Sequence, residues 1–141
     1  MITPAEAMRR LQNAAESGEL DVFCRRHAVR VLTVFGSAGR GEEHPRDLDV
    51  GILVEPDAEF DVVAAITDLV ELAGTDAVDL AHLNRGGPVI CERALVGSVA
   101  LYESEPGALA EAQVVAIAER IETDPMRRLN LRLLAERHPD R

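Results

Sequence analysis

Apolar residues follow two different spacings along this chain, and segments of the two kinds alternate. Runs rich in valine, leucine and isoleucine predict buried strands at about Val29–Phe35, Leu48–Val54, Ala77–Leu83 and Val99–Glu103. Apolar positions three and four residues apart predict helices at about Pro4–Ser17, Leu20–His27, Phe60–Ala73, Gly86–Val96, Pro106–Glu122 and Pro125–Arg137. This alternation predicts an α/β or α+β fold, with a small mixed β-sheet flanked by helices.

Capping residues set the ends of several predicted helices. Thr3 and Glu6 have the form of a capping box, with Pro4 at the first helical position. Asp124 followed by Pro125 has the pattern of an N-cap and a first helical residue. The C-terminal region is therefore expected to form two helices.

The last predicted helix carries one leucine more than a single packing surface needs. Its apolar stripe consists of Met126, Leu129, Leu133 and Leu134. Leu131 lies off this stripe, between Arg128 and Arg132. Two interpretations stay open: the helix packs on its own sheet, or it contacts another chain, either a partner or a second copy.

Length and composition narrow the class of protein. A chain of 141 residues fits one domain, so we expect residues 1–141 to form a single domain. The hydrophobic content is 47% but aromatic residues make up only 3%, which predicts an aliphatic core. The net charge of −10 argues against a long nucleic-acid groove, because such grooves neutralise phosphates with clustered basic residues.

Other classes of site are not indicated by the sequence. Cys24 and Cys91 stand alone, without the spacing of a zinc site or a disulfide framework. The N-terminus lacks a basic region followed by an apolar run, and no apolar stretch approaches the roughly 18 residues that span a bilayer. We therefore expect a cytoplasmic protein that does not enter a membrane.

The segment from Phe35 to Gly51 carries the candidate chemistry. Asp47 and Asp49 are two residues apart at the start of a predicted strand, so both carboxylates leave the same face. Such a pair suits Mg²⁺, which binds one or two carboxylates and completes its shell with water and phosphate oxygens. Gly36 and Ser37 form a turn whose backbone and hydroxyl can approach and donate to a phosphate.

A third carboxylate is expected on a neighbouring strand. Val78 and Leu80 take the core face of the predicted strand 77–83, which leaves Asp79 on the opposite face. With Asp47 and Asp49 it would complete a site for two metal ions. Asp76, just before the strand, is a weaker candidate for the same place.

These residues resemble the minimal nucleotidyltransferases of the DNA polymerase β-like superfamily. The signature of that family is Gly-Ser, a spacer, Asp-x-Asp, and a third acid on a following strand. The resemblance covers about residues 18–104 and leaves the helices at about 106–137 unassigned. The matching segments are Phe35-Gly36-Ser37, Arg40-Gly41-Glu42, Pro45, Asp47-Leu48-Asp49-Val50, Val78-Asp79-Leu80, Ala94-Leu95-Val96-Gly97 and Leu101-Tyr102-Glu103.

The resemblance implies an Mg²⁺-dependent transfer of AMP from ATP onto a hydroxyl, with two metal ions. It assigns catalysis and metal binding to Asp47, Asp49 and Asp79, and phosphate binding to Gly36, Ser37 and Arg40. Family members of this size are often antitoxins that modify a HEPN-type ribonuclease toxin on tyrosine, and others are toxins that modify tRNA. The acidity of this chain favours a protein hydroxyl, and so a HEPN-type toxin as partner.

Several alternatives remain at this stage. Nine residues separate Ser37 from Asp47, where the family usually has ten, and Arg46 replaces a small residue. The chain could thus be an antitoxin of the same fold that neutralises its partner by occlusion alone. Arg40 could hold its own loop instead of a phosphate. His44 and His82 fit polar loop and strand-end positions better than catalysis. Self-association is left open.

Overall fold

A computed structural model describes residues 2–137 of the chain. Four strands form one sheet: β1 (Val29–Phe35), β2 (Leu48–Val54), β3 (Val78–His82) and β4 (Val99–Glu103). The longer helices are α1 (Pro4–Ser17), α2 (Glu19–Arg26), α4 (Val62–Ala73), α5 (Pro88–Leu95) and α6 (Ala108–Arg137). Two short helices complete the fold, α3 (Gly36–Gly39) and the 3-10 turn η1 (Leu83–Arg85). The predicted α/β architecture is confirmed.

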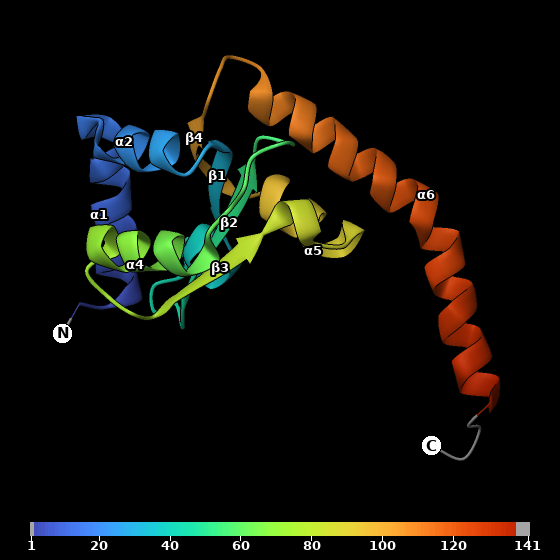
Figure 1. Cartoon of the computed structure of the whole chain (residues 1–141). Helices are drawn as coiled ribbons and strands as arrows, with labels where there is room; N and C mark the ends of the chain where they lie inside the picture. Colours follow the sequence, from blue (N-terminus) through green and yellow to red (C-terminus); the bar gives the residue numbers. More distant parts are fainter. Residues whose placement is uncertain (1, 138–141) are drawn as a thin grey trace.

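The strands form a mixed sheet with the order β3-β2-β1-β4. β1 runs antiparallel to both β2 and β4, whereas β2 and β3 are parallel. The parallel pair is connected through α4, as a crossover requires. Helices cover the sheet on both faces, and β3 lies at one edge (Figure 1).

One face of the sheet packs against α1, α2 and α4. Alternate residues of β1 and β2 point into this layer, so the side chains of Leu32, Val34, Leu48, Val50 and Ile52 are buried there.

Thr3 caps α1 as predicted, because its hydroxyl accepts a hydrogen bond from the backbone N–H of Glu6. α4 begins two residues later than predicted, since Asp61 caps it by accepting from Ala64.

The other face packs against α5 and the first half of α6. The Thr33 hydroxyl donates a buried hydrogen bond to the carbonyl oxygen of Ala94 in α5. Ala94 is fully buried, and its Cβ lies 3.0 Å from where a side chain on Gly51 would begin. A glycine at position 51 therefore lets α5 sit directly on β2. The contact fixes α5 firmly on the sheet.

The C-terminal region forms one helix, and the prediction of two helices divided at Asp124 is wrong. Pro125 lies inside α6, and Asp124 is an interior residue of the helix instead of an N-cap. Proline cannot donate to the preceding turn, yet Asp124 binds arginines on both sides of it. Its carboxylate accepts from Arg120, Arg127 and Arg128, so ion pairs bridge the weakened turn. The axis of α6 changes direction part-way along its length (Figure 1).

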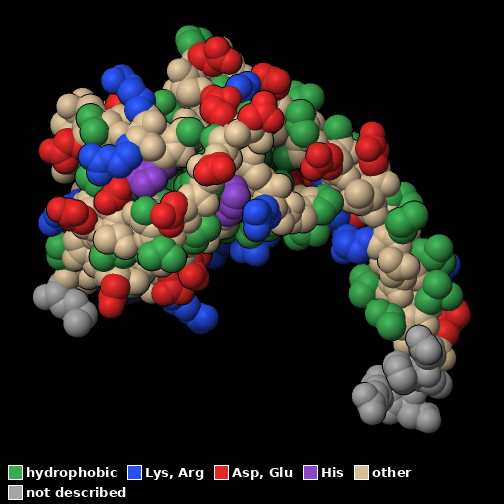
Figure 2. Space-filling view, in the orientation of Figure 1, with side chains coloured by type: hydrophobic (Ala, Val, Ile, Leu, Met, Phe, Trp, Pro, Cys, Tyr) green, Lys and Arg blue, Asp and Glu red, His purple; other side chains and the backbone are tan. Residues whose placement is uncertain are grey.

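The second half of α6 extends away from the body of the protein (Figure 1). The first half is anchored by buried Ala108, Ala112 and Ala116. Beyond it, the apolar side chains are half exposed or more, and Figure 2 shows them on the surface of this segment. They are Ile121, Met126, Leu129, Leu131, Leu133 and Leu134. Of the two interpretations left open for this segment, packing on its own sheet is therefore not what the structure shows, because the apolar stripe is solvent-exposed.

Within residues 2–137, no helix combines the length and the apolar character needed to cross a lipid bilayer.

Candidate active site

The predicted site residues lie at one end of the sheet, where β1 ends and where β2 and β3 begin. β1 ends at Phe35, which lies opposite Asp49 of β2 in the antiparallel register. Asp49 in turn lies opposite Asp79 of the parallel strand β3. Neighbouring strands are about 4.8 Å apart, so the register places these two aspartates side by side. Asp47 is exposed and lies directly before β2.

Gly36 adjoins the Asp49 carboxylate. Its φ angle of 69° lies in the left-handed region, which glycine adopts without strain. A Cβ at this position would lie 2.1 Å from Oδ2 of Asp49. Only glycine therefore allows the turn after β1 to pass so close to the carboxylate.

The loop between Ser37 and Asp47 is closed by hydrogen bonds at both ends. The Ser37 hydroxyl oxygen accepts from the backbone N–H of Arg46 at 3.2 Å, and the Ser37 carbonyl accepts from Glu42 N–H at 3.2 Å. The short loop thus still returns the chain to the start of β2. The hydroxyl hydrogen of Ser37 is not used in these bonds, so it can donate to another group.

Arg40 is paired with a residue of its own loop. Its Nε and one terminal nitrogen donate to Oε2 of Glu42 at 2.9 and 2.7 Å. The guanidinium is exposed, so this pair contributes little to stability. A phosphate contact by Arg40 would require it to exchange Glu42 for the phosphate, and that contact stays a prediction.

The electrostatics of the site centre on Asp49. Burial raises the pKa of the Asp49 carboxyl, and the negative charges of Asp79 and Asp47 raise it further. Arg93 and Arg40 act in the opposite direction. Asp79 and Asp47 are thus close enough to repel the Asp49 carboxylate, and a bound cation would relieve that repulsion.

The donor set fits a hard divalent cation such as Mg²⁺. Among the described residues, no three His, Cys, Asp or Glu side chains already stand together as ligands of one metal ion. Mg²⁺ typically takes one or two carboxylates and fills its remaining positions with water and substrate phosphates. The neighbouring carboxylates of Asp49 and Asp79, with Asp47 beside them, meet that requirement.

Arg93 is a residue of this site that the sequence interpretation missed. It lines a cavity of about 230 Å³ together with Asp49, Asp79, Phe35 and Ile90. Its guanidinium carbon lies 6.0 Å from the centre of the Phe35 ring. The sequence shows only that an arginine lies on the helix that follows the strand of Asp79. It does not show in which direction the arginine side chain points.

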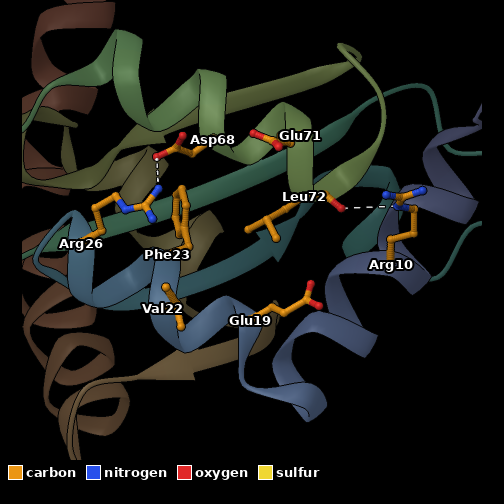
Figure 3. Close-up of a pocket in the computed structure, with 8 residues that line it drawn as sticks. All are labelled: Arg10, Glu19, Val22, Phe23, Arg26, Asp68, Glu71 and Leu72. Carbon is orange, nitrogen blue, oxygen red and sulfur yellow. Dashed lines mark hydrogen bonds and ion pairs between the residues drawn. The ribbon is translucent and has the colours of Figure 1, made fainter.

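A larger cavity lies elsewhere and contains none of the predicted site residues. It has a volume of about 570 Å³ and lies between α1, α2 and α4 (Figure 3). Arg26 there donates to Asp68 at 3.3 Å, and the His27 ring nitrogen Nε2 lies 2.7 Å from the same carboxylate. These bonds hold the pKa of Asp68 below its usual range. They tie α2 to α4, which is a structural role.

Neither of the two histidines considered for chemistry is among the residues that line the cavity of Asp49 and Asp79. The His82 ring contacts the Phe60 ring in a tilted arrangement with ring centres 4.7 Å apart, and burial lowers the pKa of His82. Phe60 packs against the helical layer of α1, α2 and α4. His44 is exposed in the loop before β2.

Solved structures share this fold. A chain of a toxin–antitoxin complex with AMP-PNP superposes with a TM-score of 0.67 at 18% identity, covering 83% of this chain and 96% of that one. A chain from tri-AMPylated Shewanella oneidensis HEPN toxin in complex with MNT antitoxin has a TM-score of 0.65 at 18% identity, covering 87% and 98%. A variant of the MntA-HpeT toxin–antitoxin, with two aspartates replaced by glutamate, gives 0.67 at 17% identity, covering 83% and 96%.

Sequence comparison identifies the family. No curated protein sequence matches the chain. Residues 19–107 match the family model described as Polymerase beta, Nucleotidyltransferase, and this segment contains the Gly-Ser turn and all three aspartates. Because the match spans well over half of its length, the chain belongs to the polymerase β nucleotidyltransferase family.

Proposed function

We propose that this protein is an Mg²⁺-dependent nucleotidyltransferase that moves AMP from ATP onto a hydroxyl of a HEPN-type toxin. In this proposal the protein is the antitoxin of that toxin. The observation that carries the proposal is the strand register that sets Asp49 beside Asp79. Gly36 adjoins the same carboxylate, so phosphate donors and metal ligands belong to one site. The reaction would use ATP as its substrate, and we propose that it takes place in the cytoplasm.

The choice of partner and acceptor rests on the solved structures of the same fold. One is described with AMP-PNP, and another pairs an MNT antitoxin with a tri-AMPylated HEPN toxin. The net charge of −10 supports a protein hydroxyl over a tRNA. We propose that residues 1–141 act as one unit, in which the core of about 18–104 supplies the chemistry and α6 contacts the partner.

Each polar residue of the site has a role in this reaction. Gly36 N–H and the Ser37 hydroxyl would donate to phosphate oxygens of ATP. Asp47, Asp49 and Asp79 would hold Mg²⁺, whose positive charge stabilises the triphosphate and the pyrophosphate that leaves. The acceptor oxygen bonds to the α-phosphorus while the bond to pyrophosphate breaks. Asp79 would accept the proton of that hydroxyl.

ATP is expected to bind on the order of tenfold or more weakly without a divalent cation, because triphosphate and carboxylates repel each other. Isothermal titration with ATP, with and without MgCl₂, measures this difference. Transfer is then followed with α-labelled ATP, MgCl₂ and a purified HEPN-type partner. Equal ATP affinity in both titrations would contradict the proposed metal bridge, and an unlabelled partner would contradict the transfer.

Replacing Gly36 by alanine is expected to reduce AMP transfer by about 10²-fold, because the new methyl group displaces the Asp49 carboxylate. Gly41→Ala is the matched control. Gly41 also has a positive φ, of 73°, but a Cβ there meets nothing within 4 Å. Both variants should lose about 1–2 kcal/mol of stability from backbone strain, measured by thermal unfolding. Equal activity of the two variants would show that the approach of Gly36 to Asp49 is irrelevant to catalysis.

A second candidate is an antitoxin that neutralises its partner by occlusion alone. The exposed apolar surface of α6 favours it, because binding through that surface needs no chemistry. A toxin-neutralisation assay with Asp49→Asn separates the two functions. Full neutralisation by this variant would support occlusion, and loss of neutralisation would support AMP transfer.

A further inference from the structure

Arg93 is a cation placed in the wall of an acidic site. It lines the same cavity as Asp49 and Asp79 and lies over the ring of Phe35, which is the register partner of Asp49. Among the described residues, no carboxylate lies within 4.0 Å of its guanidinium nitrogens. The donors of Arg93 are therefore not engaged by a carboxylate, in contrast to those of Arg40.

The backbone beneath Arg93 is held in place by its neighbour. Ala94 is fully buried, packs against Gly51, and accepts the hydrogen bond of Thr33. The helical position of Arg93 is thus fixed relative to β1 and β2, the strands that carry Phe35 and Asp49. A side chain on such a rigid support loses less freedom when it binds a ligand.

The chemistry of the cavity indicates what Arg93 binds. A guanidinium presents a planar fork of donors that matches the oxygens of a phosphate. A nucleoside triphosphate brings several negative charges into a site that already contains three carboxylates, so a fixed cation in its wall is favourable. Asp49 adjoins Gly36 and also shares the cavity with Arg93.

We infer that Arg93 is a nucleotide-contacting residue that donates to the phosphate chain of ATP from the α5 side of the site, while Gly36 and Ser37 donate from the end of β1. This inference rests on the proposed function, since it assigns a further contact within the same reaction. The role is of the same kind as the phosphate contact predicted for Arg40, which stays a separate prediction.

The test compares Arg93→Gln and Arg93→Lys with Arg9→Gln, an exposed arginine of α1 that lies outside the site. Titration with ATP and with pyrophosphate, each with MgCl₂, should show affinities roughly 10- to 100-fold lower for Arg93→Gln. Arg93→Lys should lie between this variant and the wild type, because it keeps the charge but loses the fork. The melting temperature of each variant serves as the folding control, and Arg93 is exposed, so it should change little.

The outcomes separate the inference from the proposed function. A wild-type protein that transfers AMP, together with an Arg93→Gln variant that binds ATP as tightly as Arg9→Gln, overturns the role of Arg93 alone. Weakened binding of ATP but not of pyrophosphate overturns a contact to the β- and γ-phosphates, because the contact would then be to the AMP part of ATP. A wild-type protein that neither binds ATP with Mg²⁺ nor transfers AMP overturns the proposed function itself.

Discussion

Asp49→Asn is expected to abolish AMP transfer, with a loss of roughly 10³-fold or more, and to raise the melting temperature near neutral pH. The loss follows from removing a metal-binding carboxylate whose cation would stabilise the transition state by several kcal/mol. The gain follows from electrostatics, since the Asp49 charge is destabilised by burial and by Asp79 and Asp47. A residue whose removal improves stability but destroys activity is retained for function.

The pH dependence of the stability difference between Asp49→Asn and the wild type provides an independent check of this electrostatic explanation. The pKa of Asp49 is higher in the folded than in the unfolded protein, so its ionised form opposes folding. The variant should therefore be more stable than the wild type above the folded pKa of Asp49. This advantage should shrink as the pH falls and vanish below the ordinary aspartate pKa, where both states are protonated.

Thermal unfolding at several pH values measures the effect of Asp49→Asn on stability. Asp57→Asn, in the exposed loop after β2, is the matched control and should change neither activity nor the pH profile. A large fall in the melting temperature of Asp49→Asn at neutral pH would mean that this aspartate is a structural residue. Retained AMP transfer would remove it from the proposed active site.

Truncation after Glu122 is expected to abolish assembly with the proposed partner and to leave the body folded with the proposed ATP site. The second half of α6 lies away from the body, and its large apolar side chains are exposed. Removing it therefore exposes little new core. Size-exclusion chromatography with light scattering reports assembly, and ATP titration reports the site. Unfolding or aggregation of the shortened chain would assign this segment to the core instead.

Leu131→Glu is a gentler test of the same surface. The Leu131 side chain is 57% exposed, and Val22 on α2 has nearly the same exposure at 56%. A charge buried at a dry interface costs several kcal/mol in association, whereas on a solvated face it costs little. Leu131→Glu should thus weaken the complex strongly, and Val22→Glu serves as the control for the added charge. An unchanged complex mass for Leu131→Glu would exclude Leu131 from the interface.

Much of the fold could be predicted from local sequence. Three strands, β1, β2 and β4, have the predicted bounds. A run of β-branched and aliphatic residues between turn residues can form few structures other than a buried strand. The C-terminal region was the exception. Asp-Pro usually starts a helix, but here Asp124 pairs with arginines three and four residues away on both sides of Pro125. These pairs need a helix that continues through Pro125, and the Asp-Pro pattern alone gives no sign of them.

The candidate site was predictable only in part, for a physical reason. The common face of Asp47 and Asp49 could be predicted from the two-residue period of a strand. The place of Gly36 could be predicted because a tight turn after a strand favours glycine. The pairing of Asp49 with Asp79 depends on the register of two strands separated by a crossover, which one sequence does not specify. Arg93 required the packing of α5 on Gly51 to bring its side chain to the carboxylates.

The length of α6 has a hydrodynamic consequence. A straight helix of 30 residues is about 45 Å long, which exceeds the diameter expected of the globular part of a chain this size. A single molecule of this shape experiences more friction than a sphere of equal mass, so it diffuses more slowly and elutes early from a sizing column. Elution volume alone would therefore report an isolated chain as a larger particle, and scattered light, which depends on mass, is needed to distinguish a monomer from a true dimer.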